Sequence, residues 1–335
     1  MRNIGHGRWG RTRGPSYAAL DLGSNNCRLL VAEPARDGFR VVDAFSRIVR
    51  LGEGVRATGR LSEAAMERAL DALHVCANKV RRQRAHHVRG IATEACRRAC
   101  NGREFLDRVE RETGLGFEII SAREEASLAL DSCFSLVEPR ARRALIFDIG
   151  GGSTELSFVA IDEDGACQPI NWISLPFGVV TLAEDHGGDQ VSRETFEGMI
   201  ERVASRLGEL EADAAIAAAI DRDEMQVVGT SGTVTTLAGL HLGLPAYDRG
   251  QVDGICLSFR ETESVCERLL ALDGTGRAAL PCVGTERADL VLAGCTILLA
   301  IQRRWPVGRL HVADRGLREG VLLRLMADDR RRARG

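Results

Sequence analysis

Apolar residues recur along the chain with two different periods, and these periods predict strands alternating with helices. Apolar and polar positions alternate over residues 17–34 and again over 39–51, which predicts the opening strands of a sheet. Residues 62–85 carry apolar side chains at helical spacing instead, with Leu70 and Leu73 among those expected to be buried. The first half then continues with an expected strand at 87–95, helix at 102–114, strand at 117–121 and helix at 122–137. This succession of elements is typical of an α/β fold.

The second half begins in the same way as the first. Two apolar runs, 144–147 and 156–161, flank a glycine-rich turn and predict a hairpin. Further elements are expected at 191–220 (one or two helices), 225–244 (a strand, a glycine turn and a helix), 288–305 (a helix), 309–314 (a strand) and 316–326 (a closing helix). The α/β pattern therefore extends over the whole chain.

The glycine turns of the two halves share one pattern. Residues 21–28 and 148–155 both follow a strand, begin with Asp-apolar-Gly and re-enter a strand after similar spacing, so that Arg28 occupies the register of Glu155. A duplicated domain would place the two hairpins face to face across a cleft, with one side cationic and the other lined by carboxylates. Chance recurrence of so short a pattern is the alternative.

The turn of the second half, FDIGGGSTE at residues 147–155, has more glycines than a hairpin needs. Two glycines supply the conformations of a tight turn. A third, followed by Ser153 and Thr154 and flanked by Asp148 and Glu155, leaves bare N–H groups beside hydroxyls and carboxylates. This combination suits a phosphate with a divalent cation, while a plain turn remains the other interpretation.

The composition limits the number of domains and the classes of partner, but it does not indicate a function. The chain has 335 residues, 44% hydrophobic and 27% charged, with a formal net charge of −2, so we expect two domains and no nucleic-acid or membrane partner. Lys79 is the only lysine, and arginine suits phosphate oxygens, although genome base composition also explains this bias. No apolar run approaches the roughly 20 residues of a membrane helix.

The ten cysteines are scattered without a Cys-x-x-Cys pair, and the chain opens without a signal peptide, which favours a reduced cytoplasm. The basic, glycine-rich opening and the basic end lack periodicity and are expected to be tails. The predicted organisation is a disordered tail at 1–15, domains at 16–140 and 141–328, and a tail at 329–335.

Several motifs, in order, resemble those of the exopolyphosphatase and guanosine pentaphosphatase (Ppx/GppA) family, within the actin, hexokinase and Hsp70 superfamily. They are ALDLGSNNCRLLVAE, VRLGEGV, IFDIGGGSTELSF, LPFGVVTLAE, VVGTSGTVTTLAGL and ERADLVLAGCTILLAI, and the resemblance covers residues 17 to 328. It implies two ribonuclease-H-like (actin-like ATPase) domains flanking a cleft that binds phosphate chains.

The chain departs from the family pattern at three points. Asn26 and Cys27 stand where the family commonly has Ser and Phe, and Ser127 stands where it has an arginine, which puts some substrate contacts in doubt. Longer members also continue into a helical HD-like domain, so this chain is expected to be a short form and less processive.

The resemblance also assigns roles to residues. Ser121-x-x-Glu124 fits a capping box, which leaves the next residue, Glu125, free to point into the cleft, where the family motif has its catalytic base. Arg28 and Arg97 are the expected cationic phosphate contacts, with a solvated surface arginine as the alternative for each. Mg²⁺ is the expected cofactor, held by Asp148 and Glu155. The other expected phosphate-binding residues are Asp21, Gly23, Ser24, Asn25, Asn26, Gly150, Gly151, Gly152, Ser153, Thr154, Gly229, Thr230, Ser231 and Gly232.

The expected function is Mg²⁺-dependent release of terminal orthophosphate from inorganic polyphosphate, with water activated by Glu125. The alternatives are 5′-phosphate removal from guanosine pentaphosphate, phosphate transfer between a nucleotide and polyphosphate, and binding without catalysis. The expected partners are therefore polyphosphate or guanosine pentaphosphate, in the cytoplasm, with a homodimer as the one assembly considered.

Overall fold

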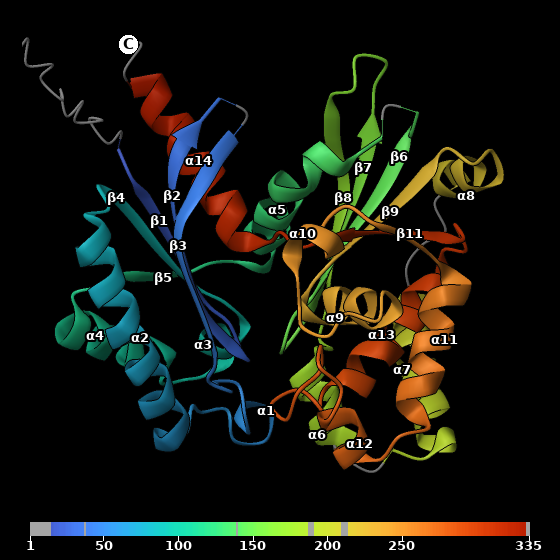
Figure 1. The fold of residues 1–335 in the computed structure, drawn as a ribbon, viewed down its shortest axis with the longest axis horizontal. Helices are drawn as coiled ribbons and strands as arrows, with labels where there is room; N and C mark the ends of the chain where they lie inside the picture. Colours follow the sequence, from blue (N-terminus) through green and yellow to red (C-terminus); the bar gives the residue numbers. More distant parts are fainter. Residues whose placement is uncertain (1–14, 37, 139, 187–190, 209–213, 333–335) are drawn as a thin grey trace, which may run out of the picture.

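Two mixed β-sheets, each covered by helices, lie side by side in the computed structural model, which describes residues 15–332 except 37, 139, 187–190 and 209–213 (Figure 1). The first sheet has the strand order β3-β2-β1-β4-β5, and the second has the order β10-β11-β9-β6-β7-β8. The strands are β1 (Tyr17–Leu22), β2 (Asn26–Ala35), β3 (Gly38–Ile48), β4 (His87–Ala92), β5 (Phe117–Ile119), β6 (Arg143–Ile149), β7 (Thr154–Ile161), β8 (Cys167–Leu175), β9 (Met225–Thr230), β10 (Cys256–Ser258) and β11 (Arg309–Ala313).

The helices fill the connections between these strands. They are α1 (Val55–Thr58), α2 (Glu63–Gln83), α3 (Glu94–Arg98), α4 (Gly102–Thr113), α5 (Ala122–Cys133), α6 (Val179–His186), α7 (Arg193–Gly208), α8 (Ala214–Asp221), α9 (Gly232–His241), α10 (Arg249–Val252), α11 (Phe259–Leu270), α12 (Gly274–Ala278), α13 (Val291–Arg304) and α14 (Leu317–Arg332), with a 3₁₀ turn η1 at Phe134–Leu136. In the described part of the chain, no helix is long and apolar enough to cross a bilayer.

The two sheets have the same topology, which confirms the fold predicted for the two halves. In each, three antiparallel strands (β1-β2-β3 and β6-β7-β8) are followed by two parallel ones (β4-β5 and β9-β11), and β10 is an addition to the second sheet. Asp21 pairs with Arg28 across the first hairpin, and Asp148 pairs with Glu155 across the second. The register predicted from the sequence is therefore confirmed.

Strand β1 is buried on both faces, because helices from different parts of the chain cover it. Leu20 and Leu22 belong to a core that includes Leu70 and Leu73 of α2, while Tyr17 packs in a second cluster with residues of α14. The two sheets lie on either side of residue 140, where the sequence predicts a domain boundary. Helix α5, however, packs on β6, β7 and β8, and α14 packs on β1, β2 and α5 (Figure 1).

Most predicted elements are present. The elements that were not predicted are the helices α6 and α11, the edge strand β8 and several short elements, α1, α3, α10, α12 and β10. Strand β8 was not predicted: it is an edge strand with exposed residues 168–172, and its alternation at Ile170, Asn171 and Trp172 is short and directly follows Pro169. The short α10 and α12 have too few residues for a helical period to show. Of the predicted tails, 1–14 and 333–335 lie outside the described residues, and residues 329–332 form the end of α14.

Candidate active site

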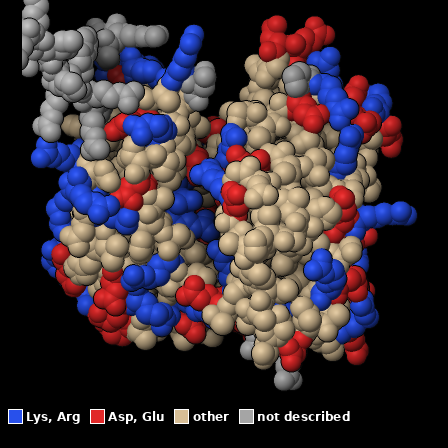
Figure 2. All heavy atoms as spheres, viewed as in Figure 1, with Lys and Arg blue, Asp and Glu red and all other residues tan. Residues whose placement is uncertain are grey.

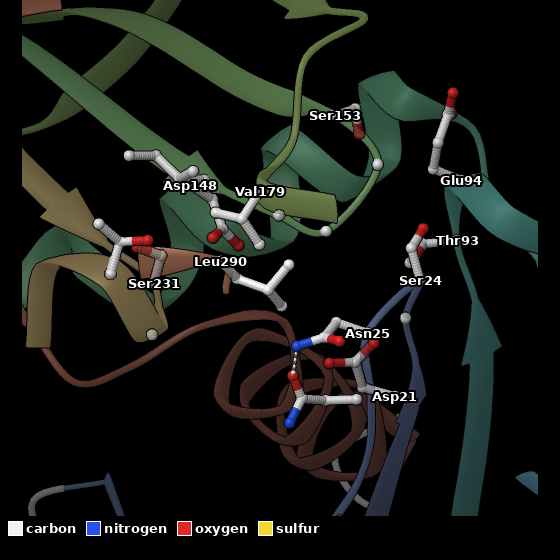
Figure 3. Close-up of a pocket in the computed structure, with 18 of the residues that line it drawn as sticks. Asp21, Ser24, Asn25, Thr93, Glu94, Asp148, Ser153, Val179, Ser231 and Leu290 are labelled. Atoms are coloured by element: carbon white, nitrogen blue, oxygen red, sulfur yellow. Dashed lines mark hydrogen bonds between the residues drawn. The ribbon is translucent and has the colours of Figure 1, made fainter. Parts of the chain in front are cut away.

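The two glycine hairpins meet at a pocket between the sheets, as the duplication predicts. Ser24 and Asn25 of the first loop lie against Gly151 and Gly152 of the second: a Cβ added to Gly151 would lie 3.0 Å from the Asn25 nitrogen, and one added to Gly152 would lie 2.8 Å from the Ser24 Oγ. Figure 3 shows side chains of both loops around the same space. The third glycine, which a simple turn does not need, is thus required by the close approach of the other domain.

The N-terminus of α6 holds the second loop in place. The Val179 and Val180 N–H groups donate to the carbonyls of Gly150 and Gly151 at 2.9 and 2.8 Å. Gly151 and Gly152 line the pocket, and their N–H groups have no hydrogen-bond partner within the described residues. Unpaired, fixed N–H groups are the donors that a phosphate oxygen requires.

Four carboxylates line this pocket, those of Asp21, Glu94, Glu125 and Asp148, and that of Glu155 lies behind it; all are largely withdrawn from water. Asp21 and Asp148 reach into the pocket from the two sheets (Figure 3), and Glu125 lines it as well. Burial raises the pKa of Asp148 and of Glu155 to about 7, and burial likewise raises the pKa of Asp21. Buried like charges resist ionisation, so the pocket favours a cation among them.

Glu155 lies behind the pocket rather than in its lining. Its side chain is only 2% exposed, and the hydroxyls of Ser153 and Ser174 donate to its Oε1 at 2.7 and 2.9 Å. Within the described part of the chain, no three His, Cys, Asp or Glu side chains are grouped to hold a metal ion. Mg²⁺ keeps several waters and needs only one or two carboxylates, so Asp148, with Glu155 opposite it in the hairpin, fits this ion.

Glu125 points into the pocket from the first turn of α5, as predicted. It is 7% exposed, and Arg97 donates from Nη1 to its Oε2 at 3.1 Å. Burial, helped by the charge of Glu155, holds the pKa of Glu125 well above its usual range despite Arg97. A carboxyl with a raised pKa beside a phosphate site is suited to accept a proton from water.

The capping box predicted for α5 is only half formed. The Ser121 hydroxyl accepts from the Glu124 N–H at 3.1 Å, but the Glu124 carboxylate binds Arg89 at 2.5 Å instead of returning to Ser121. The prediction was wrong on this point because Arg89, from the neighbouring strand β4, competes for the carboxylate. Glu124 nevertheless stays out of the pocket lining and leaves Glu125 as the inward carboxylate.

The two predicted arginines have different surroundings. Arg28 lines the pocket and has no hydrogen-bond or ion-pair partner within the described residues. Arg97 is absent from the pocket lining, because Glu94 accepts from its Nη2 and Nε at 2.5 and 3.1 Å and Glu125 accepts from its Nη1. Arg28 is therefore free to meet an anion, whereas Arg97 orients Glu125.

The remaining predicted residues divide between the pocket and its supports. Thr154 donates to the Phe177 carbonyl at 2.7 Å, and a Cβ on Gly229 would lie 2.5 Å from the Phe147 ring, so both positions are structural. The predicted residues that line the pocket are Asp21, Gly23, Ser24, Asn25, Asn26, Arg28, Glu125, Asp148, Gly150, Gly151, Gly152, Ser153, Ser231 and Gly232; Thr230 lines an adjoining cavity; Arg97, Thr154, Glu155 and Gly229 line neither.

Two polar atoms of the first loop are left without partners. Asn25 Nδ2 donates to Asn26 Oδ1 at 3.2 Å, the contact dashed in Figure 3, which leaves Asn25 Oδ1 and Asn26 Nδ2 buried and unpaired. Buried unpaired polar atoms are costly unless a ligand or water satisfies them. Both residues, Asn25 and Asn26, line the pocket.

A larger cavity of about 640 Å³ adjoins the pocket and shares Arg28 with it. Its lining also includes Arg287 and Arg318, which the sequence interpretation did not assign. Burial, with the charge of Arg28, lowers the pKa of both guanidinium groups. Figure 2 shows basic side chains along the groove between the two halves. Arg287 lies in the motif ERADLVLAGCTILLAI and Arg318 lies in the predicted closing helix, but neither sequence position indicates that these side chains lie near Arg28.

Comparison with known proteins agrees with this geometry. A profile described as the Ppx/GppA phosphatase family matches residues 30–329. The chain belongs to this family. Its two sheets, with the cleft between them, form the two-domain α/β fold of a Ppx/GppA family member.

The relatives that match this Ppx/GppA chain are named for two different activities. Exopolyphosphatase 2 of Mycobacterium tuberculosis is 29% identical, over 92% of this chain and 98% of its own length. The guanosine-5′-triphosphate,3′-diphosphate pyrophosphatase of Aeromonas salmonicida is 31% identical over 94% of this chain. The chain spans 60% of that relative's length.

Solved structures of the family superimpose on nearly the whole chain. The Ppx/GppA family member of Aquifex aeolicus has a TM-score of 0.77 at 30% identity, covering 94% of this chain and 98% of its own. An exopolyphosphatase-like protein has a TM-score of 0.82 at 28% identity, covering 93% and 98%.

The departure from the family pattern at Ser127 lies away from the pocket. Ser127 faces α14, where its hydroxyl accepts from Arg324 Nη2 at 2.5 Å, and Arg324 also donates to Asp131 at 2.6 Å. An arginine at position 127 would stand beside Arg324. The substitution therefore changes the packing of α5 on α14 and none of the pocket lining.

Proposed function

We propose that this chain is a Mg²⁺-dependent phosphohydrolase that releases terminal orthophosphate from inorganic polyphosphate. One observation carries the proposal: the buried carboxylate of Glu125 shares a pocket with the loops of the two glycine hairpins and with Arg28, which has no side-chain partner among the described residues. The exopolyphosphatase among the relatives, of which this chain covers 98%, supports the same reaction.

The proposed chemistry follows from what phosphoanhydride hydrolysis requires. The attacking water must be oriented, a base must take its proton, and the charge of the transferring phosphoryl must be neutralised. Glu125 accepts the proton, and Arg97 keeps its carboxylate turned toward the pocket. Asp148, with Glu155 behind it, would hold the Mg²⁺, which supplies positive charge to the phosphate oxygens.

The adjoining cavity supports a substrate that is a chain of several phosphates. Arg28, Arg287 and Arg318 face this cavity, and gathered guanidinium groups repel one another unless an anion lies between them. A polyphosphate whose terminal unit occupies the pocket would extend its following units past these arginines.

A second candidate substrate is guanosine pentaphosphate, and Tyr247 favours it. The Tyr247 ring lines the cavity and is 44% exposed, while its hydroxyl donates to Asp314 at 2.6 Å. An exposed ring fixed by its hydroxyl offers a face on which a nucleobase can stack. The Aeromonas relative's name points to the same substrate.

The test is orthophosphate release with Mg²⁺ from long polyphosphate, tripolyphosphate and guanosine pentaphosphate, measured side by side. Glu125→Gln is expected to lower kcat about 10²–10⁴-fold with little loss of substrate binding. Glu124→Gln is the matched control, since Glu124 neighbours it in sequence but binds Arg89, and its rate should stay near wild type. Near wild-type rates for Glu125→Gln would refute the assignment of the base.

A further inference from the structure

Residues 50–56, RLGEGVR, overlap the motif VRLGEGV, one of those that resemble the family. The proposed reaction assigns no role to this segment. It follows β3 and leads into α1, and its backbone supports the first phosphate loop. The Arg50 N–H donates to the Asn25 carbonyl at 3.0 Å, and the Gly52 N–H donates to the Ser24 carbonyl at 2.8 Å. Arg50 adopts a φ of 48°, which side chains other than glycine rarely take. The backbone of this segment is thus fixed against the pocket.

The side chain of Arg50 crosses to the other domain. Its Nη1 and Nη2 donate to the two carboxylate oxygens of Asp289 at 2.7 and 3.0 Å, and Nη2 also donates to the Glu286 carbonyl at 3.2 Å. A bidentate pair of this kind fixes orientation as well as distance. Glu286 and Asp289 flank Arg287, which lines both the pocket and the adjoining cavity.

Arg287 needs such support because its own contacts are weak. Among the residues that the structure describes, its side chain makes one hydrogen bond, from Nη1 to Thr236 Oγ1 at 3.3 Å, and the positive charge of Arg28 acts on it. On the inner side, the buried Arg277 donates to the Ala288 carbonyl at 3.2 Å. Arg50 holds the same segment, residues 286–289, through its hydrogen bonds to Asp289 and to the Glu286 carbonyl.

We propose that Arg50 is a positioning residue, which ties the phosphate loop of the first domain to the segment carrying Arg287 and so holds Arg287 beside the bound phosphate chain. This inference rests on the proposed function. Two further contacts connect this segment to the second domain: the Gly54 N–H donates to Glu184 at 2.9 Å, and Arg56 forms an ion pair with Asp185. Both acceptors lie on α6, whose N-terminus holds the second glycine loop, so the 50–56 segment contacts both sides of the cleft (Figure 1).

A double-mutant cycle between Arg50 and Arg287 tests this role. Kd for tripolyphosphate with Mg²⁺ is measured by calorimetry on proteins that also carry Glu125→Gln, in which turnover is lowered, and kcat and KM are taken from orthophosphate release by the proteins that keep Glu125. Arg287 also lines the cavity that would hold the units behind the terminal phosphate, so Arg50→Ala and Arg287→Ala are each expected to raise Kd and KM about tenfold and to lower kcat less. In the Arg287→Ala background, Arg50→Ala should add less than a twofold further loss. A second full tenfold loss there would show that Arg50 acts independently of Arg287 and would overturn the proposal.

Two further variants separate positioning from folding. Asp289→Asn should reproduce the effect of Arg50→Ala, and Arg50→Lys, which keeps the charge but loses the bidentate geometry, should give an intermediate Kd with an unchanged unfolding temperature. Arg193→Ala is the matched control, because it removes an exposed bidentate pair with Glu267 inside the second domain, and its Kd should equal that of wild type. A wild-type Kd for Asp289→Asn would also overturn the proposal.

Binding and turnover distinguish this inference from the proposed function. If the wild type binds tripolyphosphate without releasing orthophosphate, the proposed hydrolase activity is refuted. The Kd values of the Arg50 and Arg287 variants would still decide whether Arg50 positions Arg287. A wild type that does not bind tripolyphosphate would overturn both.

Discussion

Replacement of Gly178 by alanine should displace the glycine loop of the second domain without touching any charged group. Gly178 precedes α6 at the point where that helix receives the loop carbonyls. A Cβ at this position would lie 2.3 Å from the Gly151 carbonyl carbon, 2.4 Å from its oxygen and 2.5 Å from the Gly152 nitrogen. All three atoms belong to the backbone, so no side-chain rotation can relieve the contact.

The size of the effect follows from these distances. Ordinary contact for a Cβ begins at 3.4 Å, so the loop and the start of α6 must separate by about 1 Å. Overpacking of this degree costs about 1–3 kcal/mol of unfolding free energy. A shift of about 1 Å in groups that position a reacting phosphate costs on the order of 10²-fold in rate. Gly178→Ala should therefore lower kcat/KM for orthophosphate release about 100-fold while the protein stays folded.

Gly198→Ala provides the control, because Gly198 lies on α7 and a Cβ there meets nothing within 4 Å. The two variants make the same chemical change, and Gly198→Ala should leave kcat/KM unchanged and stabilise the helix by up to about 1 kcal/mol. Thermal unfolding and orthophosphate release would be measured on both. Equal kcat/KM values for Gly178→Ala and wild type would refute the argument that the bare backbone at Gly178 sets the loop position.

Three further predictions concern the charged groups. In metal-free buffer the unfolding temperature should fall as the pH rises from about 4 to above 7, because Asp148 and Glu155 have pKa values of about 7 in the folded protein and keep protons that the unfolded chain releases near pH 4. Asp148→Asn should make this fall in unfolding temperature less steep. An equal slope in the variant and the wild type would contradict the prediction. In the active enzyme, Asp148→Asn should raise the Mg²⁺ concentration for half-maximal release about tenfold or more, as measured by metal titration; an unchanged midpoint would remove Asp148 from the metal site. Arg97→Ala should raise the pKa of Glu125 further and move the acid limb of the kcat profile to higher pH, and an unmoved limb would show that Arg97 does not act on this carboxyl.

The register of both hairpins could be predicted from the sequence because it depends on neighbours in the chain. A strand alternates its faces with a period of two, so the positions of Asp148 and Glu155 relative to one glycine turn fix them as partners. The same local rule places Asp21 opposite Arg28. Glu125 could be placed because Ser121 caps the helix, even though Glu124 bonds Arg89 rather than completing the box.

Other features depend on contacts between residues far apart in the chain. Arg97 looks like a free cation in sequence, but the fold surrounds it with Glu94 and Glu125 and removes it from the pocket. Arg287 reaches Arg28 only because the domains close on each other. An amphipathic pattern shows that α14 has a buried face, yet not that the face covers β1 of the other domain.

By itself, the sequence determined the α/β order, the duplicated hairpins and the polar residues at their turns, because periodicity and turn chemistry act over a few residues. Only the tertiary structure decided which of those residues share a pocket, which glycines are required by the opposing loop, and which arginines remain unpaired. These outcomes depend on how two domains pack, and packing joins positions as distant as Arg50 and Asp289, for which no local pattern carries a signal.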